Sequence, residues 1–147
     1  MMRTRILPSA VVAIAFGLGA PVAAAKVFFP MRDHVLVVGE QVRLAVPGCD
    51  TAPGCIASYP GPVRLYLVRA DVPGQVRPVK TADPPRPARA LGRLGDRGRL
   101  MFTPRAAGRF RLVALFSVQP PGQELRTMRM AVSSVFVVHP EAGQQTA

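Results

Sequence analysis

The ten residues Arg109-Phe110-Arg111-Leu112-Val113-Ala114-Leu115-Phe116-Ser117-Val118 contain the strongest structural signal in the chain. Alternate positions beginning at Phe110 are apolar, whereas the intervening positions begin as arginine and become apolar partway along. Apolar residues that recur with a period of two are typical of a β-strand with a buried face. We therefore expect residues 109–118 to form the main strand of a β-sheet.

Shorter apolar alternations recur on both sides of this stretch. They are separated by turn-forming residues, because the chain has 16 prolines and 13 glycines, and helical spacing is not sustained in any window. The other expected strands cover residues 27–29, 34–38, 41–46, 63–69, 75–79, 90–94, 99–103 and 126–138. Ser133 and Ser134 are expected at a bulge or edge of the last strand. Residues 81–90 are expected to form an irregular surface crossover, because their prolines cannot donate to a sheet.

Short strands at roughly ten-residue spacing favour an all-β fold. The pattern is typical of an immunoglobulin-like β-sandwich of seven to eight antiparallel strands that follows an N-terminal signal peptide. The chain has no tryptophan and no cysteine pair far apart in sequence, so it differs from antibody-type domains. We expect the sandwich to cover residues 26–140 and a flexible tail to cover 141–147.

The first 25 residues have the features of a Sec-type export signal. Arg3 and Arg5 precede an apolar stretch whose densest part covers residues 10–20, and the segment ends in small residues at Ala23 and Ala25. The apolar stretch is short for a membrane span, which needs about 20 residues. We predict cleavage after Ala25, a location that is secreted, periplasmic or at the cell envelope, and no transmembrane segment after cleavage.

The charge balance is strongly basic. The chain carries 19 Lys and Arg residues against 8 Asp and Glu, a formal net charge of +11. An acidic polymer or an anionic surface is therefore a conceivable partner. The arginines are scattered, however, and do not form the block that marks a binding tail. Export and a low aromatic content of 6% argue against a nucleic-acid partner.

Cys49 and Cys55 are the two cysteines of the chain. Outside the cytoplasm, two cysteines this close in sequence most simply form a disulfide, and the turn-forming residues between them let the sulfurs meet. Such a small ring is expected to hold the shape of a loop, with a contribution of about 2 kcal/mol to stability. A metal site is disfavoured because no second pair of ligands accompanies the cysteines.

Two stretches resemble small secreted Ig-like proteins of actinobacteria. Residues 38–49, Val-Gly-Glu-Gln-Val-Arg-Leu-Ala-Val-Pro-Gly-Cys, are similar to their opening strand pair. Residues 98–104, followed by residues 107–113, are similar to their central hairpin. The resemblance covers about half of the exported part and implies an exported Ig-like fold without catalytic residues. Members often have further cysteines in their late strands, which residues 115–118 and 135–138 of this chain do not contain.

No residue pattern points to catalysis. A Ser-His-acid mechanism would need His34 or His139 beside a serine and a carboxylate, but no serine lies in a glycine-flanked elbow. The carboxylates show no paired spacing of the kind that a glycosidase uses. We therefore expect a protein that is not an enzyme and that uses no cofactor.

The alternative is a periplasmic or extracellular copper carrier. Met128 and Met130 would place two thioethers on one face of a strand, about 7 Å apart. Met31 and His34 would add a thioether and an imidazole near the new N-terminus. Sulfur ligands of this kind select Cu(I). Methionines at alternate positions of an apolar strand are equally consistent with core packing.

The main hypothesis is an exported, non-catalytic domain with a binding or structural role at the cell envelope. Its partner would be an envelope protein or an acidic polymer. Loops at one end of a sandwich usually carry such functions, and the candidates are the loop 49–55 and the segment 81–90. Tyr59 follows the first loop and is a candidate contact residue.

Overall fold

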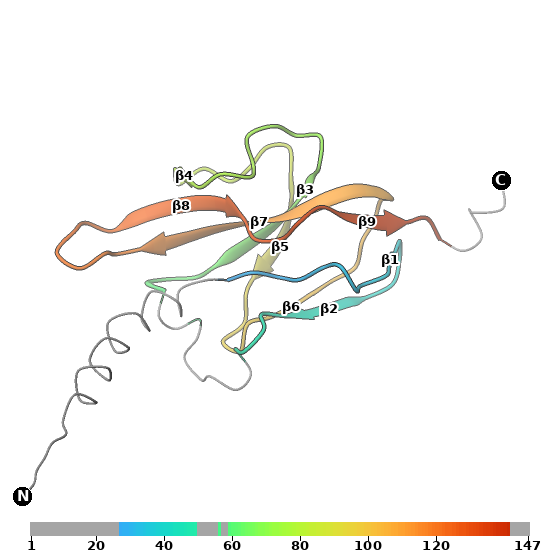
Figure 1. Ribbon diagram of the computed structural model, residues 1–147, viewed down its shortest axis with the longest axis horizontal. Helices are drawn as coiled ribbons and strands as arrows, with labels where there is room; N and C mark the ends of the chain where they lie inside the picture. The colour runs from blue at the N-terminus through green and yellow to red at the C-terminus, as the bar shows by residue number, and fades with distance from the viewer. Residues whose placement is uncertain (1–26, 50–55, 57–58, 142–147) are drawn as a thin grey trace, which may run out of the picture.

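The computed structural model describes residues 27–49, 56 and 59–141, and every regular element in these ranges is a β-strand (Figure 1). The all-β prediction is thereby confirmed. The strands are β1 (Leu36–Val37), β2 (Val42–Ala45), β3 (Arg64–Arg69), β4 (Val79–Lys80), β5 (Arg89–Arg93), β6 (Arg99–Phe102), β7 (Gly108–Val118), β8 (Arg126–Ala131) and β9 (Phe136–His139).

Strand β7 is the longest, with 11 residues, and organises the main sheet. It pairs with β3 along one edge and with both β8 and β9 along the other, in the path β1-β9-β7-β3-β5, while β4 extends the sheet beyond β8. Leu112 stands opposite Leu67 in this register. Because opposite residues of an antiparallel pair share a face, the alternate apolar side chains of β7 and β3 form one continuous apolar surface.

Strands β2 and β6 form a separate two-stranded antiparallel sheet. The register places Val42 opposite Phe102 and Leu44 opposite Leu100, and all four side chains are buried. They belong to the same apolar cluster as the inward side chains of β3 and β7. Figure 1 shows β2 and β6 below the main sheet, so the core lies between a large sheet and a small one.

The outer face of the main sheet is also covered near its middle. Val68, Val113 and Leu115 are buried although they lie opposite to the core face. The chain that leads from β3 to β5 passes over this face (Figure 1). Arg111 donates to the carbonyl of Ala70, and Arg129 donates to the carbonyl of Asp83, so both ends of this crossover are attached to the sheet. This cover explains why the second face of β7 changes from charged to apolar.

The expected strand 126–138 is divided into β8 and β9 by a bulge at residues 132–135. The Ser133 hydroxyl accepts a hydrogen bond from the backbone N–H of Leu112 at 2.9 Å and replaces the acceptor that a regular strand would supply. The same bulge leaves the Val132 carbonyl to accept from the backbone N–H of Phe29 at 2.8 Å. The expected place of the two serines is thereby confirmed, and the bulge attaches the start of the described chain to the sheet.

Two strand expectations were wrong in direction or length. The sandwich was expected to be antiparallel, but β1 pairs with β9 in parallel, and Phe29 forms a parallel bridge with Ser133. A period-two pattern does not encode strand direction, which follows from the path of the chain. The expected strand 75–79 is largely irregular, because only Val79 joins Lys80 in β4. The export segment 1–25 and the tail 142–147 lie outside the described residues.

Candidate functional site

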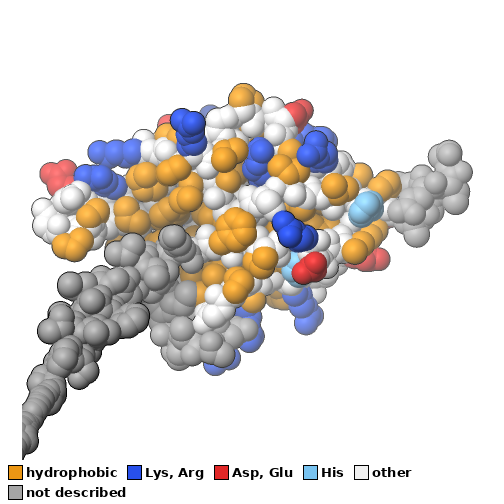
Figure 2. Space-filling model, in the orientation of Figure 1, with side chains coloured by type: hydrophobic (Ala, Val, Ile, Leu, Met, Phe, Trp, Pro, Cys, Tyr) orange, Lys and Arg blue, Asp and Glu red, His pale blue; other side chains and the backbone are white. Residues whose placement is uncertain are grey.

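An apolar cavity of about 400 Å³ opens between the main sheet and the start of the described chain. Its walls come from four separate parts of the sequence. They are Val27, Phe28, Tyr59, Val63, Phe116, Met130, Ala131 and Val132. No charged side chain is among these residues. We call this cavity the Tyr59 pocket, and Figure 2 shows apolar side chains gathered over β7 and β8 on the face that it displays.

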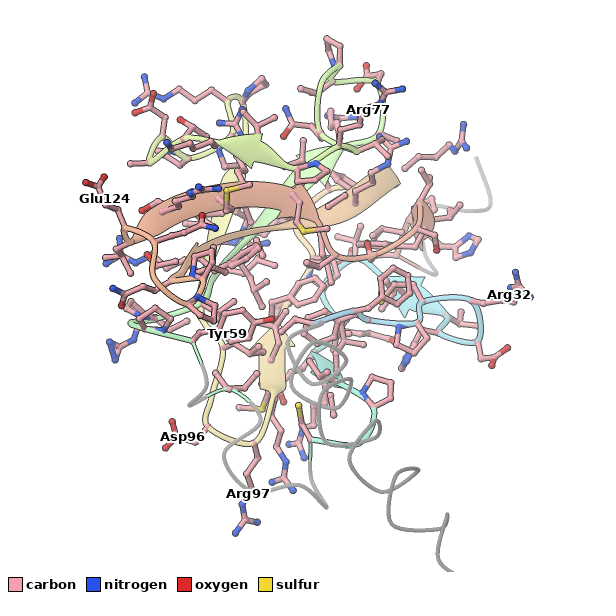
Figure 3. All side chains as sticks on the ribbon, turned by 60° about the vertical axis from the view of Figure 1, so that its left-hand side comes forward. Arg32, Tyr59, Arg77, Asp96, Arg97 and Glu124 are labelled. Atoms are coloured by element: carbon pink, nitrogen blue, oxygen red, sulfur yellow. The ribbon has the colours of Figure 1, made fainter. Side chains whose placement is uncertain are left out.

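Tyr59 forms one wall of the pocket and is only 8% exposed. Its ring meets the Phe116 ring edge to face, with centroids 5.5 Å apart and planes at 79°. Its backbone N–H donates to the carbonyl of Ile56 at 3.0 Å, which fixes the turn before β3. Figure 3 shows Tyr59 within the body of the domain, whereas the labelled charged residues such as Arg97 and Glu124 extend away from it. The expected contact residue therefore belongs to a recessed site.

Burial raises the pKa of the Tyr59 phenol above its ordinary value of about 10. The unfolded chain would lose this proton more readily, so Tyr59 leaves stability unchanged below the ordinary pKa and lowers it as the pH rises further. We expect the phenolate absorbance of the protein to contain a late-titrating component that Tyr59→Phe removes. Tyr66→Phe is the matched control, and loss of the late component in that variant instead would contradict the assignment.

The remaining pocket walls are positioned by the bulge and by strand pairing. Phe28 reaches the pocket because the next residue, Phe29, is bonded to the Val132 carbonyl. Phe116 and Met130 project to the core side of β7 and β8. The sequence analysis did not identify Phe28 or Val132 as site residues. The apolar run at residues 27–29 was the available signal, but it showed only a strand and not what that strand would approach.

Cys49 lies at the end of the turn after β2 and is 1% exposed. Its predicted partner, Cys55, lies outside the described residues, as does most of the loop 49–55. The Cys49–Cys55 disulfide therefore stays a prediction.

The candidate copper ligands are not gathered into one site. Met128 and Met130 share a face of β8, and both are partly buried beside Phe116. Met31 is buried in the core at 2% exposure, whereas His34 is exposed. The parallel bridge of Phe29 with Ser133 directs the chain towards Met31 away from β8. The two halves of the expected ligand set therefore diverge from a common point.

Within the described part of the chain, no three His, Cys, Asp or Glu side chains are close enough to hold a metal ion. The same ranges contain no helix with the length and apolar character to cross a membrane. Comparisons of the chain with protein-family models, with curated proteins and with solved structures gave no match.

Proposed function

We propose that this chain is an exported, non-catalytic Ig-like domain that binds a partner at the cell envelope, with the Tyr59 pocket as its binding site. The pocket is the observation on which the proposal depends. Its volume of about 400 Å³ falls within the range typical of sites that take small molecules or anchoring side chains. A cavity with no charged group in its lining favours binding over acid–base or nucleophilic chemistry.

The walls indicate which chemical group the pocket accepts. Tyr59, Phe28 and Phe116 present aromatic surfaces, and Met130 adds a flexible thioether that adapts to different shapes. Burying an apolar group in such a site is favourable at about 25 cal/mol per Å². The expected occupant is therefore an uncharged apolar group, such as an aromatic or branched aliphatic moiety of an envelope component.

The Ig-like assignment is supported by the arrangement of the core between two sheets and by the turn-connected strands. Export is supported by the features of residues 1–25. Expression of the full chain in a bacterium, followed by mass measurement of the protein outside the cytoplasm, should show a new N-terminus at Lys26. Retention of the full-length mass in the cytoplasm would contradict the export part of the proposal.

Binding to the pocket is tested with N-phenyl-1-naphthylamine, an uncharged apolar dye that becomes fluorescent in apolar sites. We expect saturable enhancement with one dye per protein. Phe28→Ser and Met130→Gln should each weaken binding about tenfold, since truncating a central apolar contact costs about 1–2 kcal/mol. Leu125→Ser is the matched control, because Leu125 is 56% exposed and lies outside the pocket. Equal weakening by all three changes would refute a site at the Tyr59 pocket.

A further inference from the structure

Two further cavities lie along β5, and both are rich in arginine. One has a volume of about 670 Å³ and is lined by Arg43, Arg93 and Arg99 together with residues of β2, β5 and β6. The other has a volume of about 300 Å³ and is lined by Arg69, Arg89 and Arg105 with residues near β3 and β7. Arg89 and Arg93 begin and end the same five-residue strand. We call the two cavities together the arginine groove.

The fold creates this groove from residues that are scattered in the sequence. Strand β5 is the end of the path β1-β9-β7-β3-β5 and pairs with β3. Its outer side faces the small sheet, from which β2 contributes Arg43 and β6 contributes Arg99. The six arginines thus come from five separate segments and meet where the large and small sheets lie apart.

The positive charge in the groove is not balanced by its own lining. Among the described residues that line the two cavities, none is an aspartate or glutamate. The recorded contacts of three of the arginines are with neutral groups. Arg89 donates to the Thr103 carbonyl at 2.7 Å, Arg69 lies 5.6 Å from the centroid of the Phe110 ring, and Arg43 donates to the Gln41 side-chain oxygen at 3.4 Å.

Repulsion between neighbouring guanidinium groups is evident at one end of the groove. Partial burial, together with the positive charge of Arg105, lowers the pKa of Arg89 below its ordinary value. Placing two cations together is unfavourable unless an anion lies between or beside them. A ligand with a carboxylate or phosphate group would remove this repulsion, because the planar fork of a guanidinium matches both groups.

The length of the groove indicates an extended ligand. At a rise of about 3.3 Å per residue, Arg89 and Arg93 are separated by about 13 Å along β5. A single small anion cannot contact both ends. Apolar side chains lie between the charged ends, including Leu91 on β5 and Leu100 on β6. A chain with repeated anionic groups and less polar ring or polyol faces between them would use both features.

Strand β5 is poorly suited to an added peptide strand. The register between β3 and β5 shifts at Leu65 and Tyr66, which leaves Leu91 as an extra, bulged residue, and Gly92 next to it has a φ of 111°. The Arg89 side chain also crosses from the edge to the Thr103 carbonyl. Bulges and charged side chains at a sheet edge prevent strand pairing. The groove therefore favours a non-peptide chain over an acidic peptide.

We propose that the arginine groove binds an extended anionic polymer of the cell envelope whose sugar or polyol units carry carboxylate or phosphate groups. This depends on the proposed export only for where the polymer is met, and it uses a site different from the Tyr59 pocket. The two proposals can therefore fail independently.

The test measures binding of the exported protein, produced from the full chain, to polygalacturonate as the carboxylate probe and to inorganic polyphosphate as the phosphate probe. The groove variant is the triple change Arg43→Gln, Arg93→Gln and Arg105→Gln. The control variant is Arg32→Gln, Arg77→Gln and Arg126→Gln, which removes the same charge from exposed positions outside the groove. Thermal unfolding of both variants checks that the fold is retained.

We expect the groove variant to bind at least about tenfold more weakly and the control variant to change less than about threefold, since each exposed charge pair contributes up to about 1 kcal/mol. The salt dependence of binding should also fall in the groove variant alone. A preference for one probe identifies the carboxylate or the phosphate as the recognised group. Equal losses in both variants, or binding to neither polymer, would overturn the proposal. Tighter binding to polyglutamate or to anionic phospholipid vesicles than to both polymers would also overturn it.

Discussion

Replacing Phe29 by alanine is expected to lower the free energy of unfolding by about 3–5 kcal/mol. The Phe29 side chain is 1% exposed and belongs to the main apolar cluster, so its removal leaves a cavity that the surrounding side chains cannot fill. Folded domains are stable by only about 5–15 kcal/mol. The change would therefore remove a large share of the stability, although Phe29 lies in no regular strand.

The adjacent residue provides the control for this prediction. Phe28 is 49% exposed, so Phe28→Ala removes the same atoms from a position that is half in water. We expect its effect on chemical denaturation to be about 1 kcal/mol or less. Similar losses in the two variants would show that the start of the described chain does not contribute a specific core contact.

Replacing Gly98 by alanine is expected to destabilise the domain by about 2–5 kcal/mol. Gly98 has a φ of 69°, in the left-handed region that side chains disfavour. A Cβ at this position would also lie 2.8 Å from the Cβ of Cys49 and 3.1 Å from the Cβ of Val46. The turn cannot easily move away, because the Gly98 carbonyl accepts a hydrogen bond from the Val46 N–H at 2.8 Å.

Gly122 separates the two causes of this effect. Its φ of 73° is similar, but a Cβ added there would meet no atom within 4 Å. Gly122→Ala should therefore show the backbone cost alone, about 1–2 kcal/mol. Denaturant unfolding of the two variants gives the contact with Cys49 and Val46 as their difference. Equal losses would mean that the close approach at Gly98 is relieved at no cost.

The strands that could be predicted are those whose pattern is local. The alternation at residues 109–118 appears as β7, and the patterns at 41–46, 63–69 and 99–103 appear as β2, β3 and β6 within one or two residues. The pairing of β1 with β9 was not predictable in the same way. A two-residue strand has too few positions to show a period, and its parallel direction depends on the route of the chain.

The candidate sites show the same division. Tyr59 was identified because it follows a turn-rich loop, but its contact with Phe116 requires β7 to be placed beside that loop. Met128 and Met130 share a face as their spacing predicts, whereas their separation from Met31 follows from the parallel bridge at Phe29. Spacing along a strand is a local property, and proximity between strands is not.

Side-chain periodicity was therefore sufficient to show an all-β chain and to identify which side chains are buried, because each strand presents one face to the core regardless of its neighbours. The arginine groove could not be recognised in this way. Its six arginines occupy unrelated positions, and they meet only because β5 ends the sheet next to β6 and β2. The concentration of charge at one place depends on strand order, which is decided when the two sheets pack together.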